Sequence, residues 1–520
     1  MAKLFNVLSW LIILFGLATG LHAPAAEKEI PPAFGPHVNL TEKDFTRSKS
    51  FSSKDRIVGT YYFYWYDIDT KSHVIDGDGT DALTTHPSTL EDFSYKSLRW
   101  HKKQLLDMEA AGIDVALMVF WGAPSEHDPK TDLHWSYAGL KPLVQAREEL
   151  MREGKRPPRI GLFYDTSTLQ YNHWHYHADL TTDYGKRWFY ATVRDFFSCI
   201  PSDHWAMIDG KPIVLMYTSA FAKKWDQSFV DYTTSEFMKE FGGRTPWLAP
   251  QDSWNAKADN TCSWGGALAP RNPGIGEIGP GYDHSAVPGR TPLVRERENG
   301  KFYEESWLKF LRRPSNFIMV ETWNEFHEGT DIAESKEYGR QYIELTRKYS
   351  DLFKKGWKPA TPKGPFSNAA AVSLSVGEAK STGLAIVPAE DGKTTLTEFA
   401  DRRSWLAERF NNGASMYVYF RIDDSYKGNE DMNATLKLDY FDAAPGQLGI
   451  EFDGSDSSAP FGGAYTRSEK TALTGDGKWK TASFKLDRAR FLNSQNSGAD
   501  FRVVAESSKF ALGSVTLERR

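Results

Sequence analysis

Residues Phe317–Thr330 read FIMVETWNEFHEGT, a stretch that joins an apolar run to a cluster of acids, amides and aromatic rings. A continuous apolar run such as FIMV is typical of a buried parallel strand. In a barrel of parallel strands, the carboxyl end of each strand opens onto the face that carries the active site. The stretch therefore predicts a barrel strand with Glu325 and Glu328 at the mouth.

The chain around this stretch alternates between strand-like and helix-like patterns. Apolar runs predict strands at Ile57–Tyr66, Ile113–Trp121, Arg159–Tyr164, Pro212–Tyr217, Pro246–Pro250, Ser263–Ala267, Gly274–Ile278 and Asn316–Thr322. Apolar residues at helical spacing predict helices at Tyr95–Ala111, Leu140–Glu153, Tyr184–Phe197, Phe229–Phe241, Phe302–Leu311 and Tyr338–Phe353. This alternation favours an α/β fold, a (β/α)₈ TIM-type barrel over residues 53–357. The rival is a doubly wound open sheet, but no Gly-x-Gly-x-x-Gly follows the first strand.

The composition changes after the last predicted helix. Residues 358–366 are rich in Pro, Lys and Gly and predict a linker. Short strands are predicted at Ala371–Leu374, Met416–Ile422, Ala434–Phe441, Leu448–Phe452, Lys480–Leu486, Phe501–Ala505 and Leu512–Leu517, with one helix at Glu398–Phe410. This pattern predicts a C-terminal β-sandwich domain over residues 367–520. Its tyrosines and phenylalanines fit either carbohydrate binding or a purely structural role.

The first residues have the features of an export signal. Lys3 precedes a short apolar run at Val7–Leu17, and small residues follow at His22–Ala26. We expect a signal peptide at residues 1–26, a polar leader at 27–52, and a secreted or periplasmic protein without membrane insertion once the signal is removed. A retained N-terminal anchor is the alternative. The two cysteines, Cys199 and Cys262, are expected to be buried thiols rather than a disulfide.

Charge and aromatic content narrow the class of partner. The 63 basic and 68 acidic residues leave a net charge of −5, which gives no reason to expect nucleic acid or an anionic membrane as partner. The 17 Trp and 23 Tyr suit stacking on sugar rings, although a Trp-rich core explains them equally well. We expect a polysaccharide or oligosaccharide partner and no cofactor. The sequence does not indicate the oligomeric state.

Two carboxyl groups three residues apart suit glycosidic bond cleavage. One carboxyl group must be protonated to donate to the leaving oxygen, while the other acts in its ionised form as base or nucleophile. Two acids in one aromatic-walled site push their pKa values apart, which can assign these roles. The alternative is a helix start, with Asn324 or Thr322 as N-cap and the acids favoured by the helix dipole.

Further candidates end predicted strands or lie in long loops on the same face. The predicted sugar contacts are Tyr62, Tyr64, Trp65, Trp121, Asp165, Tyr217, Trp264, Tyr282, Asp283, Asn324 and His327. For the aromatic residues, the alternative is core packing. For Asp165 the alternatives are holding Glu328 or capping the next segment, and for His327 a structural hydrogen bond.

Two segments have residues that metals bind, but neither predicts a metal site. Asp76–Asp81 resembles the start of a calcium loop, yet Pro87 stands where an EF-hand needs Glu, so a surface loop is expected. His173 and His177 have a spacing that could share a metal on a helix, but no acid lies between them as in a His-Glu-x-x-His site. A solvated or sugar-binding loop is expected there.

Four motifs occur in the order found in one known family. These are YYFYWY at Tyr61–Tyr66, AGID at Ala111–Asp114, GPGYD at Gly279–Asp283 and NEFHEGT at Asn324–Thr330. The chain thereby resembles the endo-α-mannosidase group, glycoside hydrolase family 99 and its relatives. The resemblance implies a (β/α)₈ barrel that cleaves α-mannosidic bonds internally with retention.

The same resemblance implies a role for each glutamate. Glu325 would be the base on the sugar 2-hydroxyl, whose oxygen then attacks the anomeric carbon to give an epoxide-like intermediate. Glu328 would be the general acid and then the base that activates water. Phe326 stands where the family commonly has Trp, which puts the sugar specificity in doubt. If the substrate lacks a free axial 2-hydroxyl, Glu325 would instead be a direct nucleophile.

Four functions therefore follow from the sequence, in order of preference. The first is a secreted, retaining, endo-acting glycoside hydrolase on an α-mannoside-like or related polysaccharide. The second is a non-catalytic polysaccharide-binding protein with a barrel cleft, and the third is a transglycosylase on the same scaffold. A metal-dependent hydrolase is a distant fourth, since only the His cluster supports it.

Overall fold

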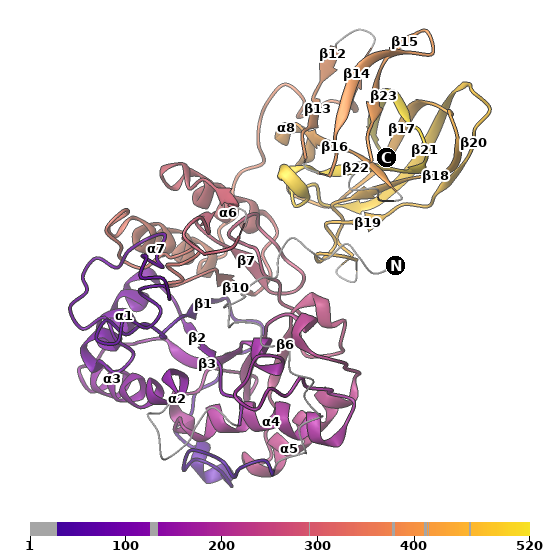
Figure 1. The fold of residues 1–520 in the computed structure, drawn as a ribbon. Helices are drawn as coiled ribbons and strands as arrows, with labels where there is room; N and C mark the ends of the chain where they lie inside the picture. The colour runs from indigo at the N-terminus through magenta and orange to yellow at the C-terminus, as the bar shows by residue number, and fades with distance from the viewer. Residues whose placement is uncertain are drawn as a thin grey trace. The chain divides into compact units, whose positions relative to one another are not determined.

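The structure is a computed structural model that describes residues 29–124, 134–290, 292–376, 380–389, 391–409, 413, 415–456 and 459–520. The chain divides into two compact units (Figure 1). The first comprises the described parts of Met1–Leu268, Ile275–Trp307 and Ser315–Trp357, and the second those of Ala269–Gly274, Leu308–Pro314 and Lys358–Arg520. The predicted signal peptide lies outside the described residues.

Strands and helices alternate along the first unit, and the end of α6 (Lys301–Arg312) belongs to the second unit. The elements are η1 (Glu42–Phe45), β1 (Ile57–Tyr62), α1 (Leu98–Ala111), β2 (Val115–Phe120), α2 (Trp135–Ala138), α3 (Leu140–Arg152), β3 (Arg159–Tyr164), η2 (Thr166–Leu169), α4 (Asp183–Ser198), η3 (Ser202–His204), β4 (Met207–Ile208), β5 (Lys211–Met216), η4 (Ser219–Phe221), α5 (Ser228–Glu240), β6 (Trp247–Pro250), η5 (Asp252–Trp254), β7 (Gly276–Ile278), β8 (Tyr282–Asp283), β9 (Val294–Arg295), η6 (Glu298–Gly300), α6 (Lys301–Arg312), β10 (Phe317–Val320) and α7 (Gln341–Lys354).

Apart from the separate β8–β9 pair, the strands of the first unit form one sheet that is parallel along the order β6-β5-β3-β2-β1-β10-β7, with β4 antiparallel to β5. Strands β1, β2, β5 and β10 are buried almost throughout, and helices such as α1, α3, α4 and α5 lie around them (Figure 1). This is one parallel strand fewer than a (β/α)₈ barrel has, so the barrel stays a prediction.

A short extended segment lies between the two end strands of this order. Cys262 N donates to Pro250 O at 3.1 Å, and Ile275 N donates to Thr261 O at 3.0 Å. The predicted strand at Ser263–Ala267 is wrong, because these residues turn instead. The turn follows from the amides of Gly265 and Gly266, which both donate to a carboxylate oxygen of Glu321.

The helices begin and end where the sequence offers capping residues. For α1, the Ser97 side chain accepts from Trp100 N, and Gly112 ends the helix with a φ of 79°. A glycine at this position adopts the left-handed conformation without a side-chain clash. Helix α1 then packs against α3 and α7 through its buried face. The helix predictions of the first unit are confirmed to within a few residues.

The second unit is rich in sheet. Its elements are β11 (Ala371–Ser375), β12 (Lys380–Thr382), β13 (Leu384–Val387), β14 (Thr394–Phe399), β15 (Arg402–Ala407), β16 (Met416–Ile422), α8 (Asp424–Lys427), β17 (Met432–Phe441), β18 (Pro445–Phe452), β19 (Thr466–Arg467), β20 (Thr471–Thr474), β21 (Trp479–Ala489), η7 (Asn496–Gly498), β22 (Phe501–Ser507) and β23 (Ala511–Arg519).

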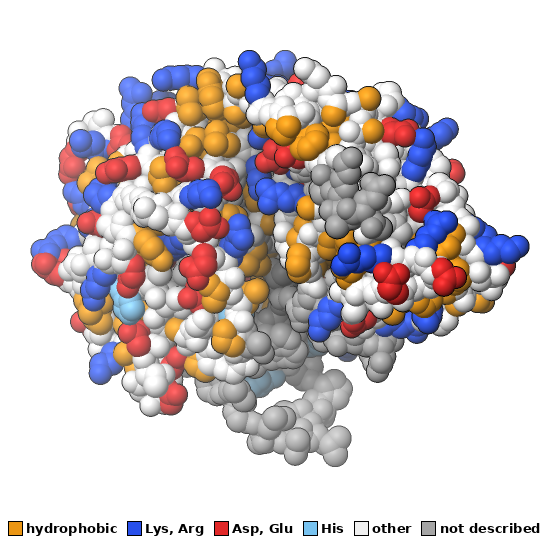
Figure 2. Space-filling model, turned by 90° about the horizontal axis from the view of Figure 1, so that it is seen from above, with side chains coloured by type: hydrophobic (Ala, Val, Ile, Leu, Met, Phe, Trp, Pro, Cys, Tyr) orange, Lys and Arg blue, Asp and Glu red, His pale blue; other side chains and the backbone are white. Residues whose placement is uncertain are grey.

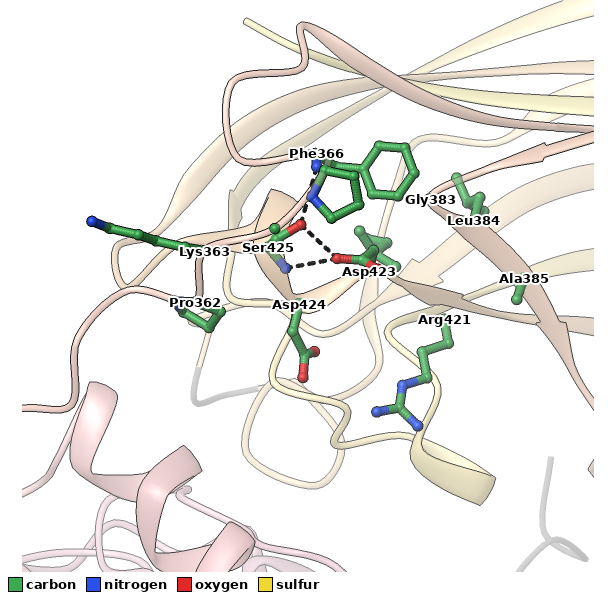
Figure 3. A pocket seen from close by; sticks show the side chains of 13 residues that line it. Pro362, Lys363, Phe366, Gly383, Leu384, Ala385, Arg421, Asp423, Asp424 and Ser425 are labelled. Carbon is green, nitrogen blue, oxygen red and sulfur yellow. Dashed lines mark hydrogen bonds between the residues drawn. The ribbon is translucent and has the colours of Figure 1, made fainter.

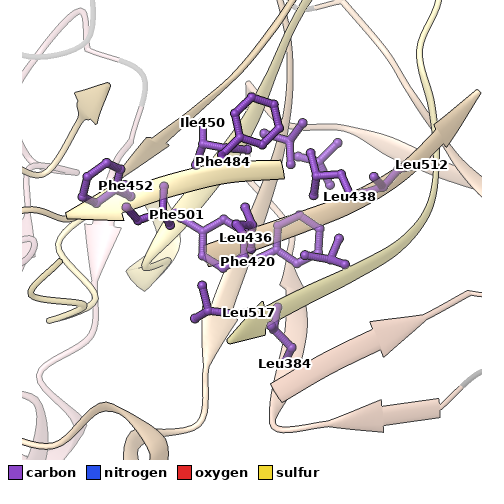
Figure 4. Close-up of a cluster of buried hydrophobic side chains, with 14 of the residues drawn as sticks. Leu384, Phe420, Leu436, Leu438, Ile450, Phe452, Phe484, Phe501, Leu512 and Leu517 are labelled. Carbon is purple, nitrogen blue, oxygen red and sulfur yellow. The ribbon is translucent and has the colours of Figure 1, made fainter. Parts of the chain in front are cut away.

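The strands of the second unit form two antiparallel sheets around one core. One sheet runs β12-β11-β23-β15-β14 with β17 and β21 beside β23, and the other runs β13-β16-β22-β18-β19 with β20 beside β18. Alternate side chains of both sheets, such as Leu436 and Phe420, point into a shared apolar cluster (Figure 4). The predicted helix at Glu398–Phe410 is wrong. Ala400 and Asp401 both have positive φ and form the turn between β14 and β15.

Three other features bear on the predictions. Within the described part of the chain, no helix is long and apolar enough to cross a membrane. Cys262 is a buried free thiol, and Cys199 is a free thiol that is partly exposed. Basic and acidic side chains are interspersed over the face seen in Figure 2.

Candidate active site

The segment after β10 turns back on itself at the carboxyl end of the sheet. Thr322 N donates to Thr330 O at 2.9 Å, and Glu325 N donates to the Thr322 side chain at 2.8 Å. This turn carries both predicted catalytic acids. It is not the helix start considered as an alternative, because the next described helix is α7.

Asn324 fixes this turn to the end of β1. Its side chain accepts from Phe63 N at 2.9 Å and donates to Phe63 O at 2.7 Å. The Tyr66 hydroxyl donates to Asn324 O and accepts from Phe326 N. Asn324 is fully buried and both ends of its amide are engaged. The structure therefore makes it a positioning residue rather than the predicted sugar contact.

Glu325 is held by a histidine two residues further on. Glu325 Oε1 lies 2.6 Å from His327 Nδ1 and accepts from His327 N at 3.0 Å. His327 Nε2 donates to the backbone oxygen of His73 at 3.0 Å. With both ring nitrogens facing oxygen acceptors, His327 fits the imidazolium form, paired with a Glu325 carboxylate. The structural hydrogen bond considered for His327 is thus present.

The charges of this pair are set by burial and by each other. Burial raises the pKa of Glu325, and the opposing charge of His327 limits that rise. Burial acts to lower the pKa of His327, but the Glu325 carboxylate outweighs it, so this pKa lies above its usual value. His73 stays neutral, because burial and the nearby charge of His327 lower its pKa to about 3.

The second oxygen of Glu325 is left for another partner. Within the described residues, Oε2 is buried and has no hydrogen-bond partner. A buried carboxylate oxygen without a donor is costly unless a ligand or water supplies one. This oxygen is therefore the atom through which Glu325 can act on a substrate.

Glu328 has a different environment. Its Oε1 forms an ion pair with Arg290 at 2.8 Å, and both side chains are 13% exposed. The Tyr282 hydroxyl lies 3.0 Å from His284 Nδ1. Burial raises the pKa of Tyr282, and the nearby negative charge of Glu328 raises it further. Sequence reasoning missed Arg290, because it lies between β8 and β9 in a loop without a motif.

The β8–β9 hairpin brings these groups to Glu328. Strands β8 and β9 pair through Tyr282 and Arg295, and Asp283 N donates to Glu328 O at 2.9 Å. The Asp283 side chain accepts from Ser285 N at 2.8 Å, so it caps its own turn. Tyr282 is thus close to the acids, while Asp283 contributes through its backbone.

Partly exposed aromatic rings surround the acids. Trp264 stacks on Phe163 at 5.5 Å between ring centroids and meets the edge of Tyr217 at 5.4 Å. Burial raises the pKa of Tyr217, and the charge of Glu328 adds to this effect. Tyr217 and Trp264 therefore lie on the Glu328 side of the site, in a position to contact a substrate.

On the Glu325 side, aromatic rings pack on one another. Trp65 is buried and stacks on His73 at 4.6 Å, with Trp121 at its edge at 5.8 Å. Trp121 Nε1 donates to Asp165 at 2.5 Å, and Asp165 also accepts from Ser167 N, which makes it the N-cap of η2. Burial raises the pKa of Asp165. Trp121 keeps partial exposure and Asp165 is engaged with the protein, whereas Nε1 of Trp65 is buried and has no hydrogen-bond partner among the described residues.

Tyr62 and Tyr64 lie outside the site, so their prediction as sugar contacts is corrected. Successive strand residues point to opposite faces, so Tyr62 faces helix α1, where its hydroxyl meets His101 at 3.0 Å. The Tyr64 hydroxyl donates to Ser136 O in α2 at 2.7 Å. Both side chains are fully buried.

Two buried acids inside the sheet also escaped the sequence analysis. Glu277 on β7 accepts from the Tyr61 hydroxyl at 2.9 Å, and burial raises its pKa well above the usual value. Glu321 accepts from the amides of Gly265 and Gly266 at 2.9 and 2.8 Å. Glu277 thereby connects β7 to β1, and Glu321 connects the Gly265 turn to the end of β10.

Of the two segments considered for metals, Asp76–Asp81 lies near the candidate site: burial raises the pKa of Asp76, and the charge of His327 opposes that rise. Asp78 accepts from the backbone and side chain of Thr80, as in an ordinary surface turn. His173 and His177 are exposed. Across the described ranges, no group of three or more His, Cys, Asp or Glu residues could hold a metal ion.

Curated relatives match one segment of the chain. The glycoprotein endo-alpha-1,2-mannosidase of Mus musculus is 36% identical over 96 residues, which cover 16% of this chain and 21% of the relative. The glycoprotein endo-alpha-1,2-mannosidase-like protein of Homo sapiens is 31% identical over 94 residues, covering 15% and 21%. The chain thus spans about a fifth of the length of the curated relatives it matches. The resemblance to the endo-α-mannosidase group is confirmed over this segment.

Solved structures match different shares of the chain at low sequence identity. The GH99 endo-alpha-mannosidase from Bacteroides thetaiotaomicron, in complex with bis-tris-propane, has 17% identity and a TM-score of 0.44, over 59% of this chain and 99% of its own. The C-terminal CBM6 of LamC, a laminarinase from Zobellia galactanivorans, has 11% identity and a TM-score of 0.15, over 28% of this chain and 98% of its own.

A family model covers most of the first unit. The model matches residues 42–362, which is more than half of the chain. All the acids and aromatic rings of the candidate site fall within this range. The chain therefore belongs to the family described as Domain of unknown function (DUF5010).

Proposed function

We propose that the first unit is a retaining, endo-acting glycoside hydrolase that cleaves an α-mannoside-like or related polysaccharide with Glu325 and Glu328. The observation that carries this proposal is the pair of unlike carboxyl environments on one turn. Glu325 is oriented by His327 and keeps one oxygen without a partner, whereas Glu328 lies beside Arg290 and Tyr282. Cleavage of a glycosidic bond needs two carboxyl groups in different states.

In this mechanism Glu325 acts as the base. Its Oε2 takes the proton of the sugar 2-hydroxyl, and the 2-oxygen attacks the anomeric carbon as the bond to the leaving oxygen breaks. The imidazolium of His327 keeps Oε1 engaged and favours the ionised form of Glu325 before this step. The direct-nucleophile role remains for a substrate without a free axial 2-hydroxyl.

Glu328 acts as the general acid and then as the base for water. It donates a proton to the leaving oxygen, and it later removes a proton from the water that opens the intermediate, while Glu325 returns its proton to the 2-oxygen. The ion pair with Arg290 holds Oε1 of the Glu328 side chain in place. For the first step Glu328 must take up a proton, so substrate binding has to draw Arg290 away from it.

The same ion pair favours a second candidate function. A carboxylate that stays bound to Arg290 cannot donate a proton, and the protein would then bind polysaccharide without turnover. A transglycosylase would use the same acids with a sugar hydroxyl in place of water. The products of a single incubation distinguish these outcomes, because only hydrolysis yields new reducing ends without longer chains.

The test measures new reducing ends from a panel of α-mannans and related polysaccharides. We expect cleavage by the parent protein and loss of about 10²- to 10⁴-fold in Glu325→Gln and Glu328→Gln, with binding retained. A matched control is Glu334→Gln. Glu334 lies in the same loop, but its carboxyl group pairs with Lys103. Undiminished cleavage in either catalytic variant, or binding without cleavage by the parent, would overturn the proposal.

The proposal extends to the fold and to the location of the protein. An eighth barrel strand is supported by the backbone bonds of Thr261 and Cys262 to the two end strands.

Secretion or periplasmic export is supported by the apolar run at Val7–Leu17 and the small residues that follow. N-terminal sequencing of the mature protein tests the second point, with a start near residue 27 expected.

A further inference from the structure

A hollow of about 680 Å³ lies in the second unit, separate from the acids of the candidate active site (Figure 3). Three segments line it: the end of the linker, the start of β13 and the end of β16 with α8. The lining residues are Pro362, Lys363, Gly364, Pro365, Phe366, Gly383, Leu384, Ala385, Arg421, Ile422, Asp423, Asp424 and Ser425. Its volume falls in the range of sites that bind small organic molecules rather than a single ion.

The acids of this hollow are already occupied. Asp423 accepts from Ser425 N at 2.9 Å and from the Ser425 hydroxyl at 2.6 Å, as the dashed lines in Figure 3 show. Asp424 forms an ion pair with Lys427 at 2.8 Å. Burial acts to raise the pKa of Asp424, but Lys427 and the neighbouring arginines outweigh it and lower this pKa. Both acids of the hollow therefore already have partners within the second unit.

The cations at the rim, in contrast, are available. Arg421 on β16 and Lys363 on the linker are both exposed. Within the described part of the chain, no hydrogen bond or ion pair of ≤ 4.0 Å joins either side chain to a partner. Arginine presents a planar set of donors that matches the oxygens of a carboxylate or a sulfate group.

One wall of the hollow is apolar and preformed. The backbone N–H of Phe366 donates to the Ser425 hydroxyl at 3.2 Å, which fixes the backbone from which the ring projects. Gly383 has a φ of 79°, and a Cβ there would lie 2.7 Å from Val372 and 3.0 Å from the Phe366 ring. Glycine thus allows the aromatic ring to settle beside β13, where Pro362 and Pro365 add further apolar surface.

We propose that this hollow binds a segment of anionic saccharide, with Arg421 and Lys363 on its sulfate or carboxylate groups and Phe366 with the prolines against its sugar rings. The anion follows from the unpaired cations, and the saccharide from the apolar wall and the size of the hollow. The choice of a saccharide over another organic anion rests on the proposed function of the first unit. The site would hold a charged polysaccharide independently of cleavage.

Calorimetric titration of the full-length protein tests the site. The probes are short oligosaccharides of three kinds: sulfated, uronate-containing and neutral mannan-derived, with inorganic sulfate as a fourth. We expect the sulfated or the uronate probe to bind, and to bind more weakly as salt is added. The two anionic probes show which acid group is recognised.

Variants at the rim assign the binding to this hollow. Arg421→Ala and Lys363→Ala should each weaken anionic saccharide binding by about tenfold, since each removes a charge-assisted contact. The matched control is Arg403→Ala, an exposed arginine on β15 outside the hollow, which should leave binding unchanged. The exposed positions leave the core intact, and far-ultraviolet circular dichroism checks the fold.

Three outcomes would overturn the inference. The first is equal binding of neutral and anionic probes, and the second is unchanged affinity in both rim variants. The third is full competition by inorganic sulfate at matched concentration, which would show an anion site that does not recognise sugar. Cleavage assays on neutral mannan keep this result apart from the proposed function. Cleavage without anionic binding defeats only this inference, whereas anionic binding without cleavage by the parent defeats only the hydrolase proposal.

Discussion

Glu325 and Glu328 are three residues apart on one turn, yet two different regions of the first unit hold them. The loop between β1 and α1 reaches Glu325 through the backbone oxygen of His73 and the ring of His327. The β8–β9 hairpin reaches Glu328 through Arg290. One acid therefore has a titratable partner, whose pKa lies above its usual value, and the other has a permanent cation. The difference teaches that chemically identical side chains gain distinct states from the loops around them.

Removing His327 should have the largest effect on this contrast. In His327→Gln we expect cleavage to fall by about 10²-fold, because Glu325 loses the donor that orients Oε1 and favours its ionised form. The pKa of His327 lies above its usual value, so the imidazolium persists from acid pH through about pH 6.5 and is lost only as pH rises through the raised pKa. Parent activity should therefore fall on the basic side through this titration, and the variant should lack that limb.

The ion pair of His327 and Glu325 should also make the free energy of unfolding depend on pH. A group whose folded pKa is raised stabilises the fold fully below its unfolded pKa and loses that contribution as pH rises through the folded pKa. The free energy of unfolding of the parent should exceed that of His327→Gln at about pH 6 and approach it on the alkaline side. Denaturant unfolding of both proteins across this window measures the difference. A gap that widens with rising pH would contradict the ion pair.

Asn324 supports both halves of the contrast, since it ties the turn to β1. In Asn324→Ala the backbone N–H and C=O of Phe63 both lose their buried partner. We expect a loss of about 2–4 kcal/mol in the free energy of unfolding, measured by denaturant titration. Ser136→Ala is a control, because among the described residues the buried hydroxyl of Ser136 has only the neighbouring His134 as a hydrogen-bond partner. Equal stability of the two variants would show that the hydrogen bonds between Asn324 and Phe63 contribute little to the free energy of unfolding.

A double-mutant cycle on the other acid sharpens the comparison. For Arg290→Gln and Glu328→Gln, alone and together, we expect a coupling energy of about 1–2 kcal/mol in the free energy of unfolding. Because arginine stays charged, this coupling should be constant between about pH 6 and 9, unlike that of His327. Thermal and denaturant unfolding at several pH values measure it. A coupling that disappears at alkaline pH would erase the distinction between the two regions.

Local patterns explain how far the sequence predicts this molecule. The acids of FIMVETWNEFHEGT could be found because strand, turn and carboxylates follow one another along the chain. The turn at Gly265 could not, since it depends on the carboxylate of Glu321, which lies far away in sequence. The hairpin turn at Ala400 lacks the usual Asn-Gly signal, so β15 was predicted as helix. Arg290 reaches Glu328 only after β8 and β9 pair.

Tyr62 shows the smallest expected effect and tests the opposite face of the same strand. Tyr61 points inward to Glu277, whereas Tyr62 points outward to His101 on α1, because side chains alternate along a strand. In Tyr62→Phe the ring still fills its place and only the hydroxyl contact is lost. We expect the free energy of unfolding to fall by about 1 kcal/mol and cleavage to stay unchanged.

The matched variant Tyr282→Phe removes a hydroxyl beside Glu328 and should lower cleavage with little change in stability, as its side chain is partly exposed. If Tyr62→Phe lowers cleavage more than Tyr282→Phe does, the sugar-facing side of the molecule is not the one defined by Glu325 and Glu328.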